Sequence, residues 1–273
     1  MSRKSTHSIA AGILSEYREF LSILNRQMRG PFSIIDAVNI LKLPKEKVEK
    51  LLPYLARKGW LKRVRQGAYI TVPLEARSSK LWKEDGWIIG SKFFTPCYIG
   101  GWNAAQYFEL TEQHFRSIII YTTKRVRNTK QIIDETPYVI RTIKKEKMFG
   151  VESIWIREHK INISNPSKTI VDLLDTPSLG GGIRHVAQVL NEYFQSKYKN
   201  DKLLKKYLEL INNKAIYKRL GYLIETLKIT APNIYNLCIK KNNRGDVYLD
   251  PDLPKEKGVK DKKWRLIINA SIN

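Results

Sequence analysis

A few carboxylates and one lysine provide the residue types of a metal-dependent nuclease. In the segment "IWIREHKINI", one residue separates Glu158 from Lys160, so a strand there would place both on one face. A carboxylate can hold Mg²⁺ while a lysine steadies the attacking water or the scissile phosphate. Asp134 or Glu135 would supply the second carboxylate. Because Glu-x-Lys arises readily in a lysine-rich chain, we favour a surface ion pair or a phosphate-contacting face.

Other groups that could take part in catalysis lack the spacing that the chemistry requires. Asp172 and Asp175 in "TIVDLLDTP" could pair as general acid and base, but we interpret them as exposed side chains near a helix end. "LGGGI" at 179–183 is interpreted as a tight turn that opens a helix rather than as an anion site. The histidines are scattered, at positions 7, 114, 159 and 185. We therefore expect no enzymatic activity, no catalytic residue, no metal and no cofactor.

The segment "GWLKRVRQGAYI", residues 59–70, predicts two short strands around a basic turn. Arg63 and Arg65 alternate with Val64, which places both arginines on the outer face of the hairpin. Gln66 and Gly67 follow at the turn. Basic side chains at such a tip suit contact with the phosphate backbone of a nucleic acid.

Three helices are predicted before this hairpin. Apolar spacings of three and four indicate a helix over 6–29, which Gly30 and Pro31 end. Ser33, with Asp36 three residues on, indicates the cap of a second helix over 33–42. A third helix over 44–58, with Gly59 at its end, contains Pro53, where we expect a bend, and a buried stripe of Val48, Leu51, Leu52 and Leu55.

Three helices followed by a hairpin are the plan of a winged helix-turn-helix, in which the third helix enters the major groove and the hairpin is the wing. The sequence therefore predicts contacts to DNA from Lys45, Lys47, Lys50, Arg63, Arg65 and Gln66. A second basic segment, "FRSIIIYTTKRVRNTKQ", would extend these contacts through Lys124, Arg125 and Arg127.

The net charge of the chain also favours binding of nucleic acid. The chain of 273 residues has a formal net charge of +23, and the excess of Lys and Arg runs along its whole length. Such a field attracts polyanions. Two distant cysteines, Cys97 and Cys238, make neither a zinc spacing nor a disulfide framework, so we expect a reducing cytoplasm. We expect no membrane span, and interpret the N-terminus as the start of an amphipathic helix rather than a signal peptide.

The pattern changes around residues 72–82, where "VPLEARSSKLW" is typical of a linker. We predict an N-terminal DNA-binding domain over 1–75 and a second domain over 76–273. The second domain is expected to contain strands over 76–165, "ESIWIREHKINIS" as one of them, and to be mainly helical over 166–273. The fold class is therefore α+β, with a winged helix-turn-helix followed by a larger mixed α/β domain.

Five segments, in order along nearly the whole chain, resemble the AbiEi-type antitoxins of type IV, abortive-infection toxin–antitoxin systems. They are "LLPYLARKGWLKRVRQGAYITVP", "GGWNAAQYFELTEQHFRSIIIYTTKRVRN", "NPSKTIVDLLDTPSLGGGI", "AIYKRLGYLIETL" and "YLDPDLPKEKGVKDKKWRLIIN". Pro53 within the third helix and the high lysine content depart from the family's pattern.

The resemblance implies a role in defence against phage. The N-terminal winged helix would bind inverted repeats in promoter DNA of its own operon and repress it. The C-terminal domain would counter a nucleotidyltransferase-like toxin encoded beside it, without a stable complex being assumed. This chain lacks the Gly-Ser and paired-aspartate pattern of such a toxin.

Two other functions stay open on sequence grounds. One is a stand-alone transcription regulator whose second domain senses a ligand or a partner, with the aromatic-rich stretch 82–108 as a possible pocket lining. The other is the Mg²⁺-dependent nuclease that would use Glu158 and Lys160. Of the three functions, we expect the chain to be an antitoxin that represses its own operon.

Overall fold

The structure is a computed structural model that describes residues 15–73, 76, 78–79, 81–254 and 258–272. The predicted helix start at 6–14, His7 and part of the linker lie outside these residues. Runs of helices and runs of strands follow one another along the chain, and the sheets are mixed or antiparallel, which agrees with the α+β class. The chain folds into two compact units. The first consists of Met1–Lys92 with Ile133–Glu135 and Arg157–His159, and the second holds the rest.

This division lies at 92/93, whereas the sequence placed the domain boundary at 75/76. Two contacts account for the difference. The Lys62 ammonium donates to the Trp82 carbonyl at 2.8 Å, and the Ile88 side chain lies close against Gly30. Residues beyond 75 therefore complete the first unit.

Over residues 15–73, the described part of the first unit has six elements in the predicted order, including one short strand that was not predicted. They are α1 (Ser15–Gln27), β1 (Phe32–Ser33), α2 (Ile34–Leu41), α3 (Lys45–Arg57), β2 (Leu61–Arg65) and β3 (Ala68–Thr71). The strands form an antiparallel sheet in the order β1-β3-β2. The helices bury a shared apolar cluster against this sheet, which includes Leu24, Phe32, Leu52 and Tyr69.

The predicted signals at the helix ends are confirmed. Ser33 Oγ accepts from the Asp36 amide at 3.1 Å, and the Asp36 carboxylate accepts from the Ser33 amide at 2.8 Å, which completes a capping box. At the end of α3, Gly59 adopts φ +81°, and its amide donates to the Ala56 carbonyl. The Trp60 amide donates to the Leu55 carbonyl, so the helix closes in a Schellman motif.

The second unit is built on a six-stranded sheet in the order β6-β7-β5-β4-β9-β8. Its strands are β4 (Cys97–Ile99), β5 (Ile118–Thr122), β6 (Lys130–Ile133), β7 (Thr136–Thr142), β8 (Val151–Ile156) and β9 (His159–Ser164). Strand β5 runs parallel to β7 and antiparallel to β4. All of β5 is buried, as its β-branched run predicts.

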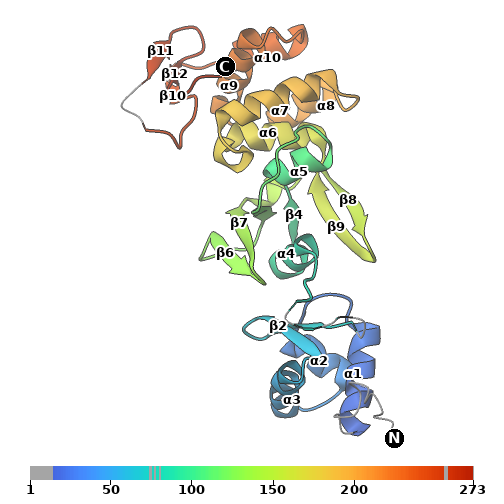
Figure 1. The fold of residues 1–273 in the computed structure, drawn as a ribbon. Helices are drawn as coiled ribbons and strands as arrows, with labels where there is room; N and C mark the ends of the chain where they lie inside the picture. Colours follow the sequence, from blue (N-terminus) through green and yellow to red (C-terminus); the bar gives the residue numbers. More distant parts are fainter. Residues whose placement is uncertain (1–14, 74–75, 77, 80, 255–257, 273) are drawn as a thin grey trace, which may run out of the picture. The chain divides into compact units, whose positions relative to one another are not determined.

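Helices and a small second sheet complete this unit. The helices are α4 (Gly86–Phe94), which spans the division, α5 (Gly101–Tyr107), α6 (Pro166–Asp175), α7 (Ile183–Gln195), α8 (Asp201–Ile211), α9 (Lys214–Thr226) and α10 (Pro232–Lys241), with short 3-10 turns η2 (Lys145–Lys147) and η3 (Pro177–Gly180). Helices α5 to α9 gather together while strands of the large sheet extend away from them (Figure 1). The small sheet has the order β10-β12-β11, from Val247–Tyr248, Leu266–Ile268 and Val259–Asp261.

The structure corrects one sequence prediction in this unit. "ESIWIREHKINIS" is not one strand but the hairpin β8–β9, which turns at Arg157 in the left-handed region, φ +53°. Strand β4 lies between helices α4 and α5, where Tyr98 and its neighbours complete the sheet beside β5. The mainly helical stretch 166–273 also includes the short strands β10, β11 and β12.

The small sheet is fixed to α9 at a glycine. Trp264 is buried, and its indole Nε1 donates to the Glu225 carboxylate at 2.7 Å. The ring lies directly over Gly221, where a Cβ atom would come within 2.1 Å of it. A side chain at position 221 is therefore excluded unless Trp264 moves.

We predict that Gly221→Ala lowers the free energy of unfolding by about 1–3 kcal/mol, the usual cost of overpacking a core. Urea denaturation of the full chain measures it. Gly245→Ala is the matched control, because nothing lies within 4 Å of the position of its Cβ. Equal stability of the two variants would contradict the close packing of Trp264 on α9.

Candidate nucleic-acid interface

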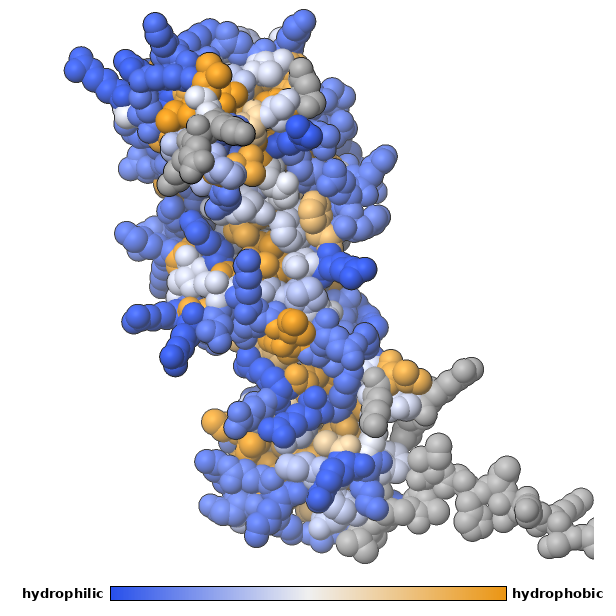
Figure 2. Space-filling model, turned by 60° about the vertical axis from the view of Figure 1, so that its left-hand side comes forward, coloured by the Kyte–Doolittle hydropathy of each residue, from blue (hydrophilic) through white to orange (hydrophobic). Residues whose placement is uncertain are grey.

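All six side chains predicted to contact DNA are exposed. Lys45, Lys47 and Lys50 lie on α3, whose opposite face is buried. Arg63 and Arg65 point outward from β2 on either side of buried Val64, as the alternation predicts. Hydrophilic side chains cover most of the molecular face in Figure 2, with apolar atoms in separate small patches.

An open groove of about 850 Å³ runs between α3 and β2. Lys50 and Arg57 line it from the helix, and Arg63 lines it from the strand. Pro53 lies between the two helix cations on the same wall, and the helix continues through it. The structure thus brings the predicted Lys50 and Arg63 together on one surface.

Arg57 is the member of this surface that sequence reasoning missed. It lies seven residues after Lys50, which is two helical turns, so both side chains share one face of α3. This spacing was a usable signal in the sequence. Glu49 lines the same groove and is the acidic group there.

Lys45 and Lys47 have carboxylate partners within the unit. The Lys47 ammonium lies 2.6 Å from the Glu16 carboxylate of α1, and 5.5 Å from the centre of the Phe20 ring. Lys45 lies 3.6 Å from Glu49. Exposed ion pairs contribute little to stability, so both lysines can exchange these partners for phosphate at low cost. Lys47 nevertheless lies on the α1 side of the helix, away from the groove.

The charged side chains of the β2–β3 hairpin differ in their surroundings. The Lys62 ammonium is only 16% exposed and lies 2.6 Å from the buried Asp134 carboxylate, so it is used within the unit. Gly67 provides the left-handed residue of the turn, φ +71°. Partial burial lowers the pKa of Arg65 from its usual value, and the guanidinium remains charged.

The structure corrects the placement on which the nuclease alternative was based. Glu158 lies in the turn after β8, whereas Lys160 lies in β9, so they do not share a strand face. The Glu158 carboxylate is 2.7 Å from the Arg29 guanidinium. The described residues hold no group of three or more His, Cys, Asp or Glu side chains that could bind a metal.

The second basic segment belongs to the other unit. Lys124, Arg125 and Arg127 are exposed in the connection between β5 and β6. The Thr142 hydroxyl donates to the Lys124 carbonyl at 3.2 Å and so ties this connection to β7. These cations therefore belong to a different unit from the groove beside α3.

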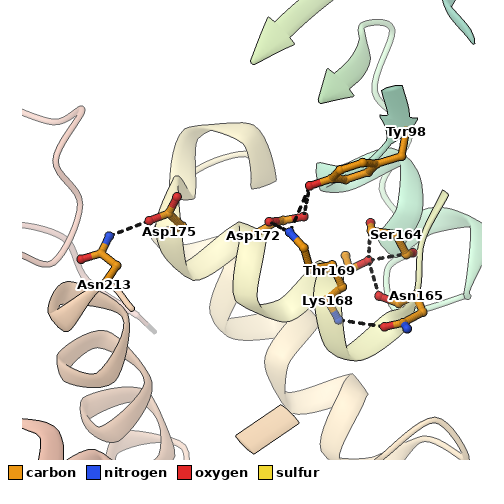
Figure 3. Close-up of polar contacts among 8 residues, drawn as sticks. All are labelled: Tyr98, Ser164, Asn165, Lys168, Thr169, Asp172, Asp175 and Asn213. Atoms are coloured by element: carbon orange, nitrogen blue, oxygen red, sulfur yellow. Dashed lines mark hydrogen bonds and ion pairs between the residues drawn. The ribbon is translucent and has the colours of Figure 1, made fainter. Parts of the chain in front are cut away.

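A buried charged network lies beneath helix α6 in the second unit (Figure 3). The Lys168 ammonium is paired with the Asp172 carboxylate one turn along the helix and donates to the Tyr98 hydroxyl at 3.0 Å. Tyr98 in turn donates to Asp172 at 3.0 Å. Lys168 also lies 5.0 Å from the centre of the Phe149 ring. Burial raises the pKa of Asp172 above its usual value, although Lys168 and Tyr98 oppose this effect.

This network corrects the interpretation of Asp172 as an exposed side chain near a helix end, because it is only 4% exposed. Asp175 lies at the helix end and accepts from the Asn213 amide at 2.6 Å (Figure 3). Asn165 caps the start of α6 and donates to the Tyr207 hydroxyl at 3.0 Å. Both ends of α6 are therefore fixed to the neighbouring helices α8 and α9.

The glycine-rich turn 179–183 does not form an open anion site. The carboxylate of Asp250, 67 residues further along the chain, accepts from the Ile183 amide at the start of α7 at 2.9 Å. The chain's own carboxylate thus occupies the position in which a helix N-terminus would hold an anion.

Comparison with known proteins gives a likeness of fold but no match of sequence. No family model matches the chain, and no curated protein matches it. The fold is similar to the crystal structure of the RV2827C protein from Mycobacterium tuberculosis, with a TM-score of 0.63 and 13% identity. The likeness covers 93% of this chain and 92% of that one, so it extends over both units. Among the described residues no helix is long and apolar enough to cross a membrane.

We predict that Lys168→Met lowers the free energy of unfolding by about 3–5 kcal/mol, because Asp172 is left buried without its partner. The loss grows as the pH rises, since a carboxyl whose pKa is raised in the folded state opposes folding when it ionises. Urea denaturation at several pH values measures both effects.

The double variant Lys168→Met/Asp172→Leu should recover most of the lost stability, because no charge is then buried. A double variant as unstable as the single one would contradict this account of the network.

Proposed function

We propose that the first unit is a winged helix-turn-helix domain that binds duplex DNA. The order of its elements and its three-stranded sheet support this, with β2 and β3 as the wing. The observation that carries the proposal is the groove beside α3, where Lys50 and Arg57 of the helix and Arg63 of the wing line one surface.

Each part of this surface has a distinct role in the proposed complex. The exposed face of α3 enters the major groove, where Lys50 and Arg57 are donors for guanine and Glu49 is an acceptor for the cytosine amino group. Arg63 and Arg65 contact phosphates, which positions the helix without reading sequence. The Gln66 amide at the wing turn adds a neutral hydrogen-bonding group. Lys45 and Lys47 reach phosphates at the helix start after leaving their surface partners.

We further propose that the chain is an AbiEi-type antitoxin in the cytoplasm, which represses its own operon and neutralises a nucleotidyltransferase-like toxin. The resemblance of five segments along the chain supports this proposal. The first unit would bind inverted repeats in the promoter, and the second unit would counter the toxin. The account requires no metal, cofactor or catalytic residue, and no stable complex with the toxin.

We predict that Arg63→Ala/Arg65→Ala weakens binding to all duplexes and reduces the salt slope of the binding constant by roughly 2, because two phosphate contacts are lost. Fluorescence anisotropy measures the binding constant at several salt concentrations, with labelled DNA from the region upstream of the gene for this chain. Lys205→Ala/Lys206→Ala on α8 is the matched control, since it removes the same charge from an exposed surface of the second unit. A slope that falls equally in both variants would contradict the wing.

The antitoxin proposal is tested by growth of cells that express the neighbouring gene product. We expect that product to be toxic, and both the intact chain and Arg63→Ala/Arg65→Ala to restore growth, because the wing is not needed for neutralisation. A harmless neighbour, with promoter binding intact, would favour the stand-alone regulator instead.

A further inference from the structure

One large aromatic side chain of the second unit is left outside the core. Trp155 on β8 is 68% exposed, whereas Trp264 of the same unit is 1% exposed. Strand β8 is an edge of the six-stranded sheet that the described residues form. Tryptophan is enriched at binding interfaces, because its ring offers a large flat apolar surface together with a polar N–H.

The hairpin register places a lysine beside this ring. Ser153 Oγ donates to Asn162 Oδ1 at 3.0 Å, which makes these residues cross-strand neighbours on one face. Two residues further toward the turn, the same face carries Trp155 on β8 and exposed Lys160 on β9. The alternate residues of β9, Ile161 and Ile163, are buried on the opposite face.

The connection between β7 and β8 brings more positive charge to this face. Since β5, β4 and β9 lie between these two strands, the connection must cross them. It crosses on the face that carries Trp155, because Met148 in it and Val151 at the start of β8 pack against the Tyr98–Tyr121 cluster. This crossing segment, 143–150, carries Lys144, Lys145 and Lys147 against one acidic residue, Glu146.

An aromatic ring on a sheet face that also carries several lysines is suited to nucleic acid. Lysine is depleted at protein–protein interfaces, which argues against a protein partner on this face. Sites for single strands combine a flat aromatic ring, on which an unpaired base stacks, with cations that follow the backbone. The bases of a duplex are already stacked on one another and cannot cover Trp155.

We propose that this face of the second unit binds single-stranded nucleic acid, with an unpaired base stacked on Trp155 and phosphates held by Lys160 and the lysines of the crossing segment. This site is distinct from the duplex-binding surface proposed for the first unit. It takes DNA or RNA, because stacking and phosphate contacts do not distinguish the two.

The test measures binding of the full chain to labelled (dT)15 and (rU)15 strands and to a 15-base-pair duplex. Trp155→Ala should weaken single-strand binding by about five- to a hundredfold, the range found for lost base stacking, and leave duplex binding unchanged. A base stacked on Trp155 should quench its fluorescence when the single strand binds. Trp155→Phe should retain most of the affinity but lose this quenching. Lys160→Ala should reduce the single-strand salt slope by roughly 0.7.

Two variants serve as matched controls. Ile132→Ala removes another exposed apolar side chain, from β6 at the opposite edge of the sheet, and Lys240→Ala removes an exposed charge from α10. Neither should change single-strand binding. No single-strand binding by the wild-type chain, undiminished quenching in Trp155→Phe, or equal loss in Trp155→Ala and Ile132→Ala would each overturn the proposal, as would equal losses for duplex and single strand.

Discussion

Helix α6 carries a lysine and a carboxylate into the interior of the second unit, where neither charge would be stable alone. Lys168 and Asp172 compensate each other one helical turn apart, and Tyr98 of the sheet bonds to both. This arrangement fixes the rotation of α6 on the sheet, because any other rotation would leave a charge against apolar side chains. The helices that follow pack on α6 from that one orientation, so the helical half of the unit depends on a contact of three side chains.

The first unit follows a simpler constraint. Its core needs one face of α3, and burial of Val48, Leu51, Leu52 and Leu55 leaves the basic residues of that helix in water. The hairpin that follows has only one buried side chain between its two outer arginines. The alternation that buries the apolar side chains of α3 and β2 therefore exposes their basic side chains. We propose duplex DNA as the ligand of that surface and single-stranded nucleic acid as the ligand of the face around Trp155.

Sequence reasoning succeeded where a signal is local. The capping box at Ser33, the Schellman end at Gly59 and the strand alternation around Val64 each depend on residues close together in the chain. It failed where distant residues decide. Asp172 is buried against Tyr98, which is 74 positions away in the sequence, and Lys62 of the β2–β3 hairpin pairs with the distant Asp134. The turn of the hairpin β8–β9 has no glycine signal in the sequence, because a non-glycine residue, Arg157, adopts its left-handed conformation.

Photocrosslinking tests whether α3 and the β2–β3 hairpin form a DNA-binding surface. A photoreactive residue at position 57 is placed in the groove beside α3, and a second one at position 206 marks an exposed surface of α8. With a duplex taken from the DNA upstream of the gene for this chain, we expect crosslinks to bases from position 57 and none from position 206. Crosslinks from position 206 alone, or from neither position while the duplex is bound, would contradict it.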